Sequence, residues 1–289
     1  MSIQTGILYI VATPIGNLSD LSERAVSVLA GVDIVAAEDT RHSRPLLARC
    51  GSRARLVSLH DHNERDRAPG LVGHLLGGAS IALISDAGTP LVSDPGYRLV
   101  AAAAQAGVRV SPVPGPSALV AALSVAGLPT DRFTFEGFPP SRAAARRMWF
   151  DRLVSEERTM VFYESPRRLR ESMDDMSDVF GEARRAVVAR ELTKAFETVR
   201  RGTLADLSEW VGGDANQQRG EIVVVVEGAQ DPGVASAELE SRKVIGVLLR
   251  YLPVKSAVKA AAELTGLPRN ALYDIAVRLK EEDAMGGPS

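Results

Sequence analysis

Several features that would narrow the class of this protein are missing from its sequence. The 289 residues include one cysteine, Cys50, so no disulfide can form within the chain and no cysteine metal site is possible. No apolar run reaches the ~18 residues that a membrane span needs. Residues 1–5 lack the charged start of a signal peptide. We therefore expect a protein of the reducing cytoplasm with no membrane segment.

The glycine patterns of common ligand sites are also missing. The chain has no Gly-x-Gly-x-x-Gly that opens a helix after a strand, and no Gly-x-x-x-x-Gly-Lys-Ser/Thr, so dinucleotide and P-loop functions lose their main support. Ser117 does not lie in a Gly-x-Ser-x-Gly elbow, which argues against hydrolase chemistry. A metal is not expected, because His60 and His62 have only Glu64 or Asp66 nearby to complete a ligand set.

No charge of one sign dominates the whole chain, whose net charge is −2. The distribution is uneven, because residues 241–280 carry eight Lys or Arg against only Glu263 and Asp274. A local basic patch can dock phosphates on a protein that is close to neutral.

The apolar pattern predicts an α/β fold. Short apolar strands are expected at 7–13, 33–37, 80–85 and 108–113, with helices at 19–30, 64–76, 96–106 and 117–126. Because these strands are apolar without alternation, both faces of the sheet are buried and the sheet is largely parallel. The turn at 127–131 separates a second α/β unit, with helices at 142–156, 167–180 and 204–211 and strands at 159–163, 186–189 and 222–227.

The last part of the chain is predicted to be helical. Residues 228–237 are small and polar and are interpreted as a linker, followed by helices at 244–252, 256–264 and 269–280. The two last helices, joined by a Gly turn, suggest a helix-turn-helix that binds nucleic acid, with a plain helical cap as the alternative. The predicted domains are therefore 1–128, 129–232 and 240–282.

Four loops follow predicted strands, where α/β proteins bind ligands. They are residues 12–18, 85–96, 112–118 and 162–166. The second is the most unusual, since Asp86 stands at a strand end and Gly88 permits close backbone approach. Asp94 and Pro95 could instead start a helix as N-cap and first residue. Ser117 could simply cap its helix, and Phe162 and Tyr163 could belong to a core rather than line a pocket.

Charged side chains supply candidates for proton transfer and phosphate contact. Possible general bases lie at Glu38 and Asp39, at Glu164, and at Glu191 with Glu197, although Asp39 could merely pair with Arg41 or Arg44. A second set has helical spacing and includes an aromatic ring, so it could face phosphates or only solvent. It comprises Arg142, Arg146, Arg147 and Arg152, with Trp149 among them.

Taken together, residues 11–18, 37–41, 86–96, 114–118, 162–166 and 190–194 resemble the bacterial 16S rRNA cytidine 2′-O-ribose methyltransferases of the tetrapyrrole methylase superfamily. The resemblance extends from about residue 6 to residue 280; residues 137–140 depart from the family pattern only locally. It implies two α/β domains with S-adenosylmethionine in a cleft between them, a small C-terminal helical domain, and usually a homodimer. It also implies methylation of a ribose 2′-hydroxyl in the decoding region of 16S rRNA. The expected partner is 16S rRNA within the 30S subunit, with naked rRNA as the alternative.

Residue roles come from two sources: the resemblance implies the cofactor contacts, whereas loop position, residue type and charge suggest the catalytic and RNA-binding residues. The implied cofactor contacts are Pro14, Asp86, Gly88, Thr89, Val92, Ser117, Ala118, Phe162 and Tyr163. For catalysis, Glu38, Asp39 or Glu191 is the candidate base, and Lys194 or Arg41 orients the nucleotide phosphate. The predicted RNA contacts are Arg41, Arg142, Arg146, Arg147, Lys255, Lys259 and Arg269. Two rivals remain, a corrin or porphyrin methylase and an inactive RNA-binding protein.

Overall fold

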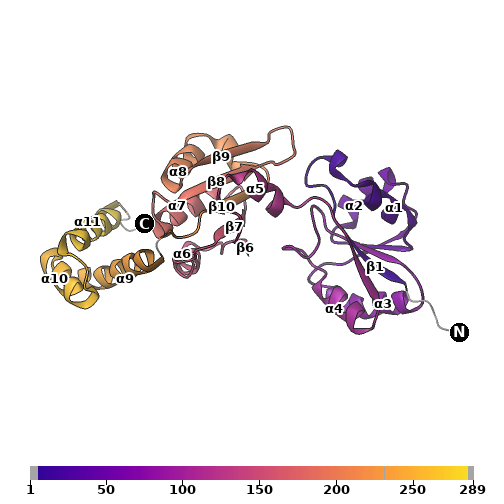
Figure 1. Cartoon of the computed structure of the whole chain (residues 1–289), viewed down its shortest axis with the longest axis horizontal. Helices are drawn as coiled ribbons and strands as arrows, with labels where there is room; N and C mark the ends of the chain where they lie inside the picture. The colour runs from indigo at the N-terminus through magenta and orange to yellow at the C-terminus, as the bar shows by residue number, and fades with distance from the viewer. Residues whose placement is uncertain (1–5, 231, 286–289) are drawn as a thin grey trace. The chain divides into compact units, whose positions relative to one another are not determined.

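The computed structural model describes residues 6–230 and 232–285. The chain divides into two compact units. One contains the residues up to Gly127 together with Ala189–Val199, and the other contains Leu128–Val188 together with the residues from Arg200 onwards. Figure 1 labels the helices and several of the strands.

The first unit is built on a five-stranded sheet with the order β3-β2-β4-β1-β5. The strands are β1 (Ile7–Val11), β2 (Ile34–Ala37), β3 (Arg55–Ser58), β4 (Ile81–Ile84) and β5 (Arg109–Val113). All four neighbouring pairs are parallel, with Leu8 opposite Ile81 and Ile34 opposite Arg55. Every residue of β2 and β4 is buried, so the expected parallel sheet is confirmed in this unit.

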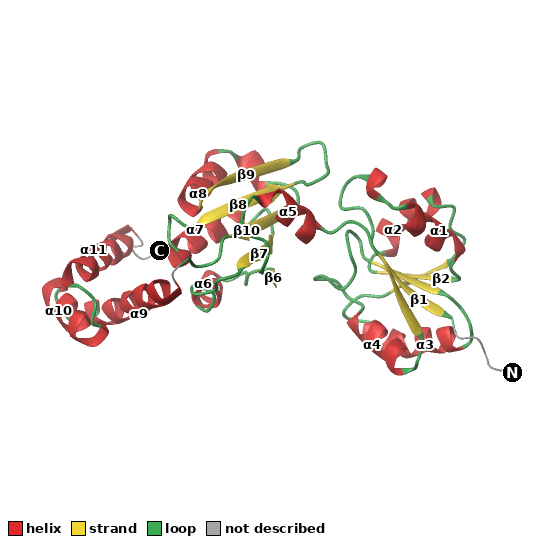
Figure 2. Ribbon diagram, viewed as in Figure 1, coloured by secondary structure: helices red, strands yellow, loops and turns green. Residues whose placement is uncertain are grey.

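Helices cover both faces of this sheet (Figure 2). They are α1 (Glu23–Gly31), α2 (Thr40–Arg49), α3 (Glu64–Leu76) and α4 (Tyr97–Gln105), and α5 (Ala118–Ala126) follows β5 in the chain. One apolar cluster joins α1 and α2 to the sheet through Leu29, Leu47 and Val35. Another joins α3 and α4 through Leu75, Leu99 and Leu83. Because the strands are parallel, the loops that follow them lie at one edge of the sheet.

The second unit has a mixed sheet with the order β6-β7-β10-β8-β9. Its strands are β6 (Phe133–Gly137), β7 (Thr159–Glu164), β8 (Arg185–Arg190), β9 (Thr198–Thr203) and β10 (Ile222–Val226). β6 pairs with β7 in parallel, whereas β7 and β10 are antiparallel. Helices α6 (Ala143–Asp151), α7 (Leu169–Phe180) and α8 (Leu204–Gly213) share one core with this sheet, which includes Phe150, Met173 and Leu207.

Three helices complete the second unit: α9 (Pro232–Leu249), α10 (Val254–Thr265) and α11 (Arg269–Met285). They have a core of their own, formed by Ile245, Val258, Ala261, Leu272 and Ala276. The interpretation of residues 228–237 as a linker is wrong, because α9 already begins at Pro232. A proline suits the first position of a helix, because the N–H that proline lacks would have no hydrogen-bond partner within the helix there.

Other predicted boundaries also need correction. The first helix begins at Glu23 rather than at residue 19, because the Ser22 hydroxyl caps it by accepting the Ala25 N–H at 3.1 Å. Helix α6 ends at Asp151, five residues before the predicted end. Helix α2 and strands β3, β6 and β9 were not predicted. Among the described residues, no helix is long and apolar enough to cross a membrane.

Candidate functional site

The candidate site lies where β1 and β4 stand side by side in the first sheet. After β1 the chain crosses through α1 to β2, on the far side of β4, whereas after β4 it crosses through α4 to β5, on the far side of β1. Neighbouring parallel strands whose connections leave in opposite directions form a switch point, and ligands of open α/β sheets bind at its carboxyl edge. The loops after β1, β2, β4 and β5 all reach this edge.

Hydrogen bonds lock the loops after β1 and β4 together. The N–H of Thr13 donates to the carbonyl of Gly88 at 2.8 Å, and the N–H of Gly88 donates back at 3.1 Å. Gly88 has φ +82°, and a Cβ there would lie 3.3 Å from the side chain of Ile15. The Thr89 hydroxyl donates to the Pro116 carbonyl at 2.9 Å, which adds the loop after β5. Three of the four predicted loops therefore meet.

The predicted cofactor residues of this unit all belong to these joined loops. They are Pro14, Asp86, Gly88, Thr89, Val92, Ser117 and Ala118. Ser117 is the N-cap position of α5, but its side chain makes no capping hydrogen bond. The interpretation of Ser117 as a simple cap is therefore wrong. The first N–H groups of α5 are left available to an anionic ligand group.

The loop after β4 has an unusual backbone. Leu91 and Ser93, on either side of Val92, have φ of 72° and 67°. This left-handed backbone conformation costs free energy in residues other than glycine. Gly96 has φ 127°, and a Cβ there would lie 2.6 Å from Leu83. Strained conformations of this kind concentrate at functional sites, because the surrounding structure must hold them in place.

Acidic side chains gather at the same edge. Burial raises the pKa of Glu38, and the negative charges of Asp86, Asp94, Asp61 and Asp39 raise it further. Burial also raises the pKa of Asp94 to about 6, although a hydrogen bond from Ser85 opposes this and Asp86 and Asp61 add to it. A positively charged ligand would relieve the repulsion within this group.

Asp94 has a different role from the structural one considered for it. Helix α4 begins at Tyr97 and its N-cap is Gly96, so Asp94 caps no helix and Pro95 does not open one. Sequence reasoning missed its importance, because an Asp-Pro pair before an apolar helix is an ordinary helix start. The perturbed pKa of a half-buried carboxyl in a strained loop marks Asp94 as a candidate functional residue.

Asp39 behaves differently from its neighbour Glu38. It is the N-cap of α2, where its side chain accepts the Arg41 N–H at 2.8 Å and the guanidinium at 3.2 Å. The hydrogen bonds from Arg41 lower the pKa of Asp39. Its own N–H donates to the carboxylate of Asp86 at 3.1 Å. Asp39 therefore supports the loop, and of this pair Glu38 is the better proton acceptor.

The loop between β8 and β9 brings Glu191 and Lys194 to the loop after β1. The two side chains form an ion pair at 2.7 Å. A Cβ on Gly16 would lie 2.3 Å from Cγ of Lys194, so only glycine lets the lysine pack there. Glu191 and Thr193 have φ of 51° and 67°. Among the described residues, the buried hydroxyl of Thr193 has no hydrogen-bond partner.

Two of the predicted cofactor residues, Phe162 and Tyr163, lie in the second unit. Phe162 is fully buried among Phe150, Met160 and Val224, so its side chain belongs to the core, as the alternative in the sequence analysis has it. Tyr163 is half-buried, with its ring 4.8 Å from Phe135 and 5.6 Å from Phe138.

Glu164, one of the acids considered as a base, is a structural residue. Its buried carboxylate accepts the Ser165 N–H at 2.6 Å, pairs with Arg168 at 3.0 Å and bonds the Ser172 hydroxyl. These contacts fix the approach to helix α7 and leave the carboxylate fully engaged.

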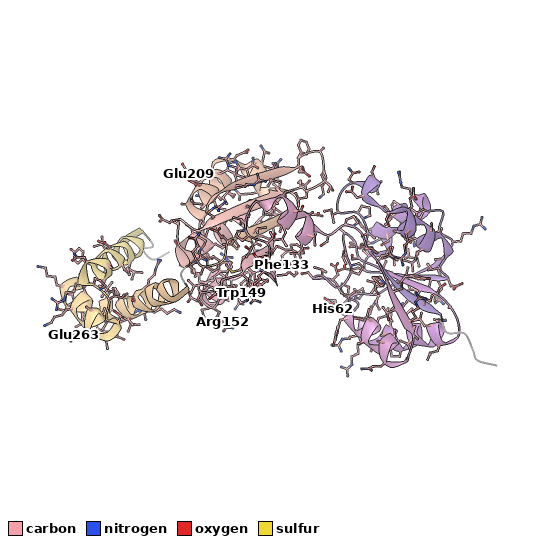
Figure 3. The ribbon with its side chains drawn as sticks, viewed as in Figure 1. His62, Phe133, Trp149, Arg152, Glu209 and Glu263 are labelled. Carbon is pink, nitrogen blue, oxygen red and sulfur yellow. The ribbon has the colours of Figure 1, made fainter. Side chains whose placement is uncertain are left out.

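The predicted arginine face on α6 is also partly wrong. Arg146 is 1% exposed and lies 2.6 Å from the buried carboxylate of Asp175, so it cannot contact RNA. Arg147 is about half exposed and shares Asp175. Arg142 and Arg152 are exposed, whereas Trp149 packs against the core with its ring 5.8 Å from that of Phe162. Figure 3 labels Trp149 and Arg152.

The remaining predicted residues lie on the surface. Lys255, Lys259 and Arg269 are exposed on α10 and α11, and Arg41 is 87% exposed. His60 and His62 lie in a turn, not on a strand, and the Asn63 side chain accepts the His60 N–H at 2.9 Å. In the part of the chain that the structure describes, no group of three or more His, Cys, Asp or Glu could hold a metal ion.

Comparison with known proteins connects these features to a family. Residues 7–208 match the Tetrapyrrole (Corrin/Porphyrin) Methylases, and residues 235–280 match the RsmI C-terminal HTH domain. The solved structure of the methyltransferase CobJ has 19% sequence identity and a TM-score of 0.58, covering 78% of this chain and 95% of its own. This structural likeness supports the fold.

Two relatives carry the name Ribosomal RNA small subunit methyltransferase I. The protein of Xylella fastidiosa (strain Temecula1) is 55% identical over 93% of this chain and 98% of its own length. The protein of Pseudomonas aeruginosa is 55% identical over 94% of this chain and 97% of its own length. The chain therefore belongs to the tetrapyrrole (corrin/porphyrin) methylase family, and within it to the group of the ribosomal RNA small subunit methyltransferases I.

Proposed function

We propose that this protein transfers a methyl group from S-adenosylmethionine to the ribose 2′-hydroxyl of a cytidine in the decoding region of 16S rRNA. The observation that carries the proposal is similarity along nearly the whole chain, including the helical C-terminal part, to relatives named for the small ribosomal subunit. The strained, acidic switch-point edge of the first sheet supplies a site with the chemistry that this reaction needs.

The residues at this edge fit the cofactor. The open first turn of α5, at Ser117 and Ala118, suits a carboxylate. The backbone at Gly88 permits close approach of a nucleoside. The negative charges of Asp86 and Asp94 suit a positively charged sulfonium. When bound, S-adenosylmethionine supplies an already activated methyl group, so the protein mainly has to bind and orient.

Alignment of the hydroxyl oxygen with the methyl carbon accounts for most of the expected rate enhancement, since positioning alone can contribute ~7–11 kcal/mol. Glu38 acts as the base that accepts the hydroxyl proton, because its raised pKa matches this task better than the lowered pKa of Asp39. Glu191 holds Lys194, and the ammonium of Lys194 orients the nucleotide phosphate together with Arg41.

The proposed substrate is the rRNA within the 30S subunit, and the protein acts as a homodimer in the cytoplasm. Arg142, Lys255, Lys259 and Arg269 are exposed and positively charged, so they can contact phosphates. Removing residues 240–289 should weaken RNA binding and flatten its salt dependence, while cofactor binding is retained. Unchanged binding to 30S subunits would refute this part of the proposal.

Mass mapping of 16S rRNA from cells that lack the protein tests the proposed reaction directly. One ribose methyl group should be missing, and the purified protein with S-adenosylmethionine should restore it on 30S subunits from those cells. Rival functions give other results. An inactive RNA-binding protein would show no heat on calorimetric titration with S-adenosylmethionine, and a corrin or porphyrin methylase would leave the rRNA unchanged.

A further inference from the structure

The positive charge of the C-terminal three-helix part is concentrated in residues 241–262. Residues 241–262 contain five basic residues and no acid, namely Arg242, Lys243, Arg250, Lys255 and Lys259. Residues 263–285 have three basic residues against five acids, Glu263, Asp274, Glu281, Glu282 and Asp283. Helix α11, the second helix of the helix-turn-helix pair, is therefore the less favourable surface for a polyanion.

Two of the five basic residues have a structural task. Arg242 donates to the carbonyl of Asp178 at 2.9 Å, and Lys243 pairs with Asp151 at 3.2 Å. These bonds connect α9 to helices α7 and α6. Arg250, Lys255 and Lys259 are instead exposed. Since Lys255 and Lys259 are one helical turn apart, they share a face of α10, opposite the buried Ala257, Val258 and Ala261.

An aromatic ring stands beside these charges. Tyr251, in the turn between α9 and α10, is 80% exposed. Its backbone is held in place, since its N–H donates to the Leu248 carbonyl at 3.1 Å. Pro253, the N-cap of α10, has no side chain that caps the helix, so the positive end of α10 faces the same turn. Glu263 lies near the other end of α10 (Figure 3).

We propose that the turn Arg250–Pro253 and the first half of α10 form a docking surface for single-stranded RNA, with Tyr251 stacking on a base and Arg250, Lys255 and Lys259 binding phosphates. An exposed, ordered aromatic among basic residues is the arrangement that binds single strands without reading their sequence. Duplex RNA offers no unstacked base for the ring. The inference rests on the proposed function for the identity of the RNA as the rRNA substrate.

Fluorescence anisotropy with the full-length protein tests the surface. The probes are an unstructured oligoribonucleotide and a blunt-ended RNA duplex of equal length. Tyr251→Ala should weaken binding of the single strand about 5- to 150-fold, which corresponds to ~1–3 kcal/mol of stacking, and Tyr251→Phe should restore it. Tyr273→Ala is the matched control, because this second tyrosine, on α11, is 48% exposed. It should change affinity less than about twofold.

A second measurement addresses the charges. Lys255→Gln should reduce the slope of log affinity against log salt by about 0.7, the value for one phosphate contact on a single strand. Equal losses for Tyr251→Ala and Tyr273→Ala, or equal losses on the single strand and the duplex, would overturn the proposal. So would a change of oligomeric state in Tyr251→Ala with RNA affinity intact, since the surface would then bind protein.

The outcome can be separated from a failure of the proposed function. If the wild-type protein binds single-stranded RNA through Tyr251 but does not methylate 30S subunits, the docking surface stands and the proposed reaction fails. If the wild-type protein methylates 30S subunits and Tyr251→Ala does so with unchanged KM and kcat, the docking surface fails and the reaction stands. We expect a raised KM with kcat unchanged, because the ring lies outside the catalytic site.

Discussion

Replacing Asp94 by asparagine should make the protein more stable at neutral pH and less able to bind its cofactor. The structure gives this carboxyl no capping role, and burial in the strained loop after β4 raises its pKa from 3.8 to about 6. An ionised carboxylate with a raised pKa is held in the folded state at a cost in free energy. Asparagine removes the charge but keeps an oxygen that can accept from Ser85.

The size and sign of the effect follow from the pKa shift. A shift of about two pKa units corresponds to ~3 kcal/mol at most, and because Asp94 is only half-buried, solvent screening reduces this to ~1–2 kcal/mol. Between pH 3.8 and about 6 the folded protein binds more protons at Asp94 than the unfolded chain does, so this group makes stability fall as pH rises. The gain from Asp94→Asn is therefore complete above about pH 6 and vanishes below about pH 4.

Scanning calorimetry of both proteins at pH 8 and at pH 4 measures this gain. Asp33→Asn is a control of opposite sign, because the Ser80 N–H, at 2.7 Å, lowers the pKa of Asp33. That variant should lose stability at pH 8, and the loss should shrink as pH falls. A melting temperature of Asp94→Asn that is unchanged at pH 8, or raised equally at both pH values, would refute the reasoning. Titration with S-adenosylmethionine should show weaker binding by the same variant.

Three other substitutions test separate parts of the argument. Gly16→Ala should slow methyl transfer, because its Cβ would lie 2.3 Å from Cγ of Lys194 and displace that side chain; steady-state kinetics measures this. Arg146→Ala should cost ~3–5 kcal/mol of unfolding free energy in denaturant titration, because it leaves the buried Asp175 carboxylate with less compensation. Glu38→Gln should keep cofactor affinity and lower kcat by ~10²–10⁴-fold in single-turnover assays.

Each of these substitutions has a matched control. Gly70→Ala, on α3, meets nothing within 4 Å, so it should leave turnover unchanged. Arg147→Ala should cost less than Arg146→Ala, because Arg147 is half exposed. Asp39→Asn should lower kcat less than Glu38→Gln. Equal kcat losses in Glu38→Gln and Asp39→Asn would contradict the role of Glu38. Equal stability losses in Arg146→Ala and Arg147→Ala would contradict the role of Arg146, and wild-type turnover of Gly16→Ala would contradict the role of Gly16.

The sequence predicts the centre of each sheet well and its margins poorly. The strands β2 and β4 are apolar throughout, and residues 33–37 and 80–85 were recognised for that reason. The missed strands β3, β6 and β9 lie at sheet edges. In β9, polar residues outnumber apolar ones, so its sequence shows no clear two-residue period. The loops after β1, β4 and β5 were found because turn residues follow apolar runs.

Side-chain roles could be predicted less well, because they depend on partners far along the chain. Helical spacing groups Arg142, Arg146 and Arg147, yet only the position of Asp175 on α7 decides that Arg146 is buried. The short run that contains Phe162 and Tyr163 does not show which ring faces the core. In the same way, the sequence contains no sign that Lys194 packs on Gly16.

Glu38 and Asp39 show most directly why the proton acceptor needs a structure. They are adjacent acids after the same strand, and composition treats them alike. At the start of α2, Asp39 accepts hydrogen bonds from the backbone and the side chain of Arg41, and these lower its pKa. Glu38 is instead partly buried and lies near the negative charges of Asp86 and Asp94, and both effects raise its pKa. A carboxylate that must take a proton from a ribose hydroxyl benefits from a raised pKa. By placing a helix N-terminus one residue after Glu38, the fold therefore makes this residue a stronger candidate than Asp39 for the proposed base.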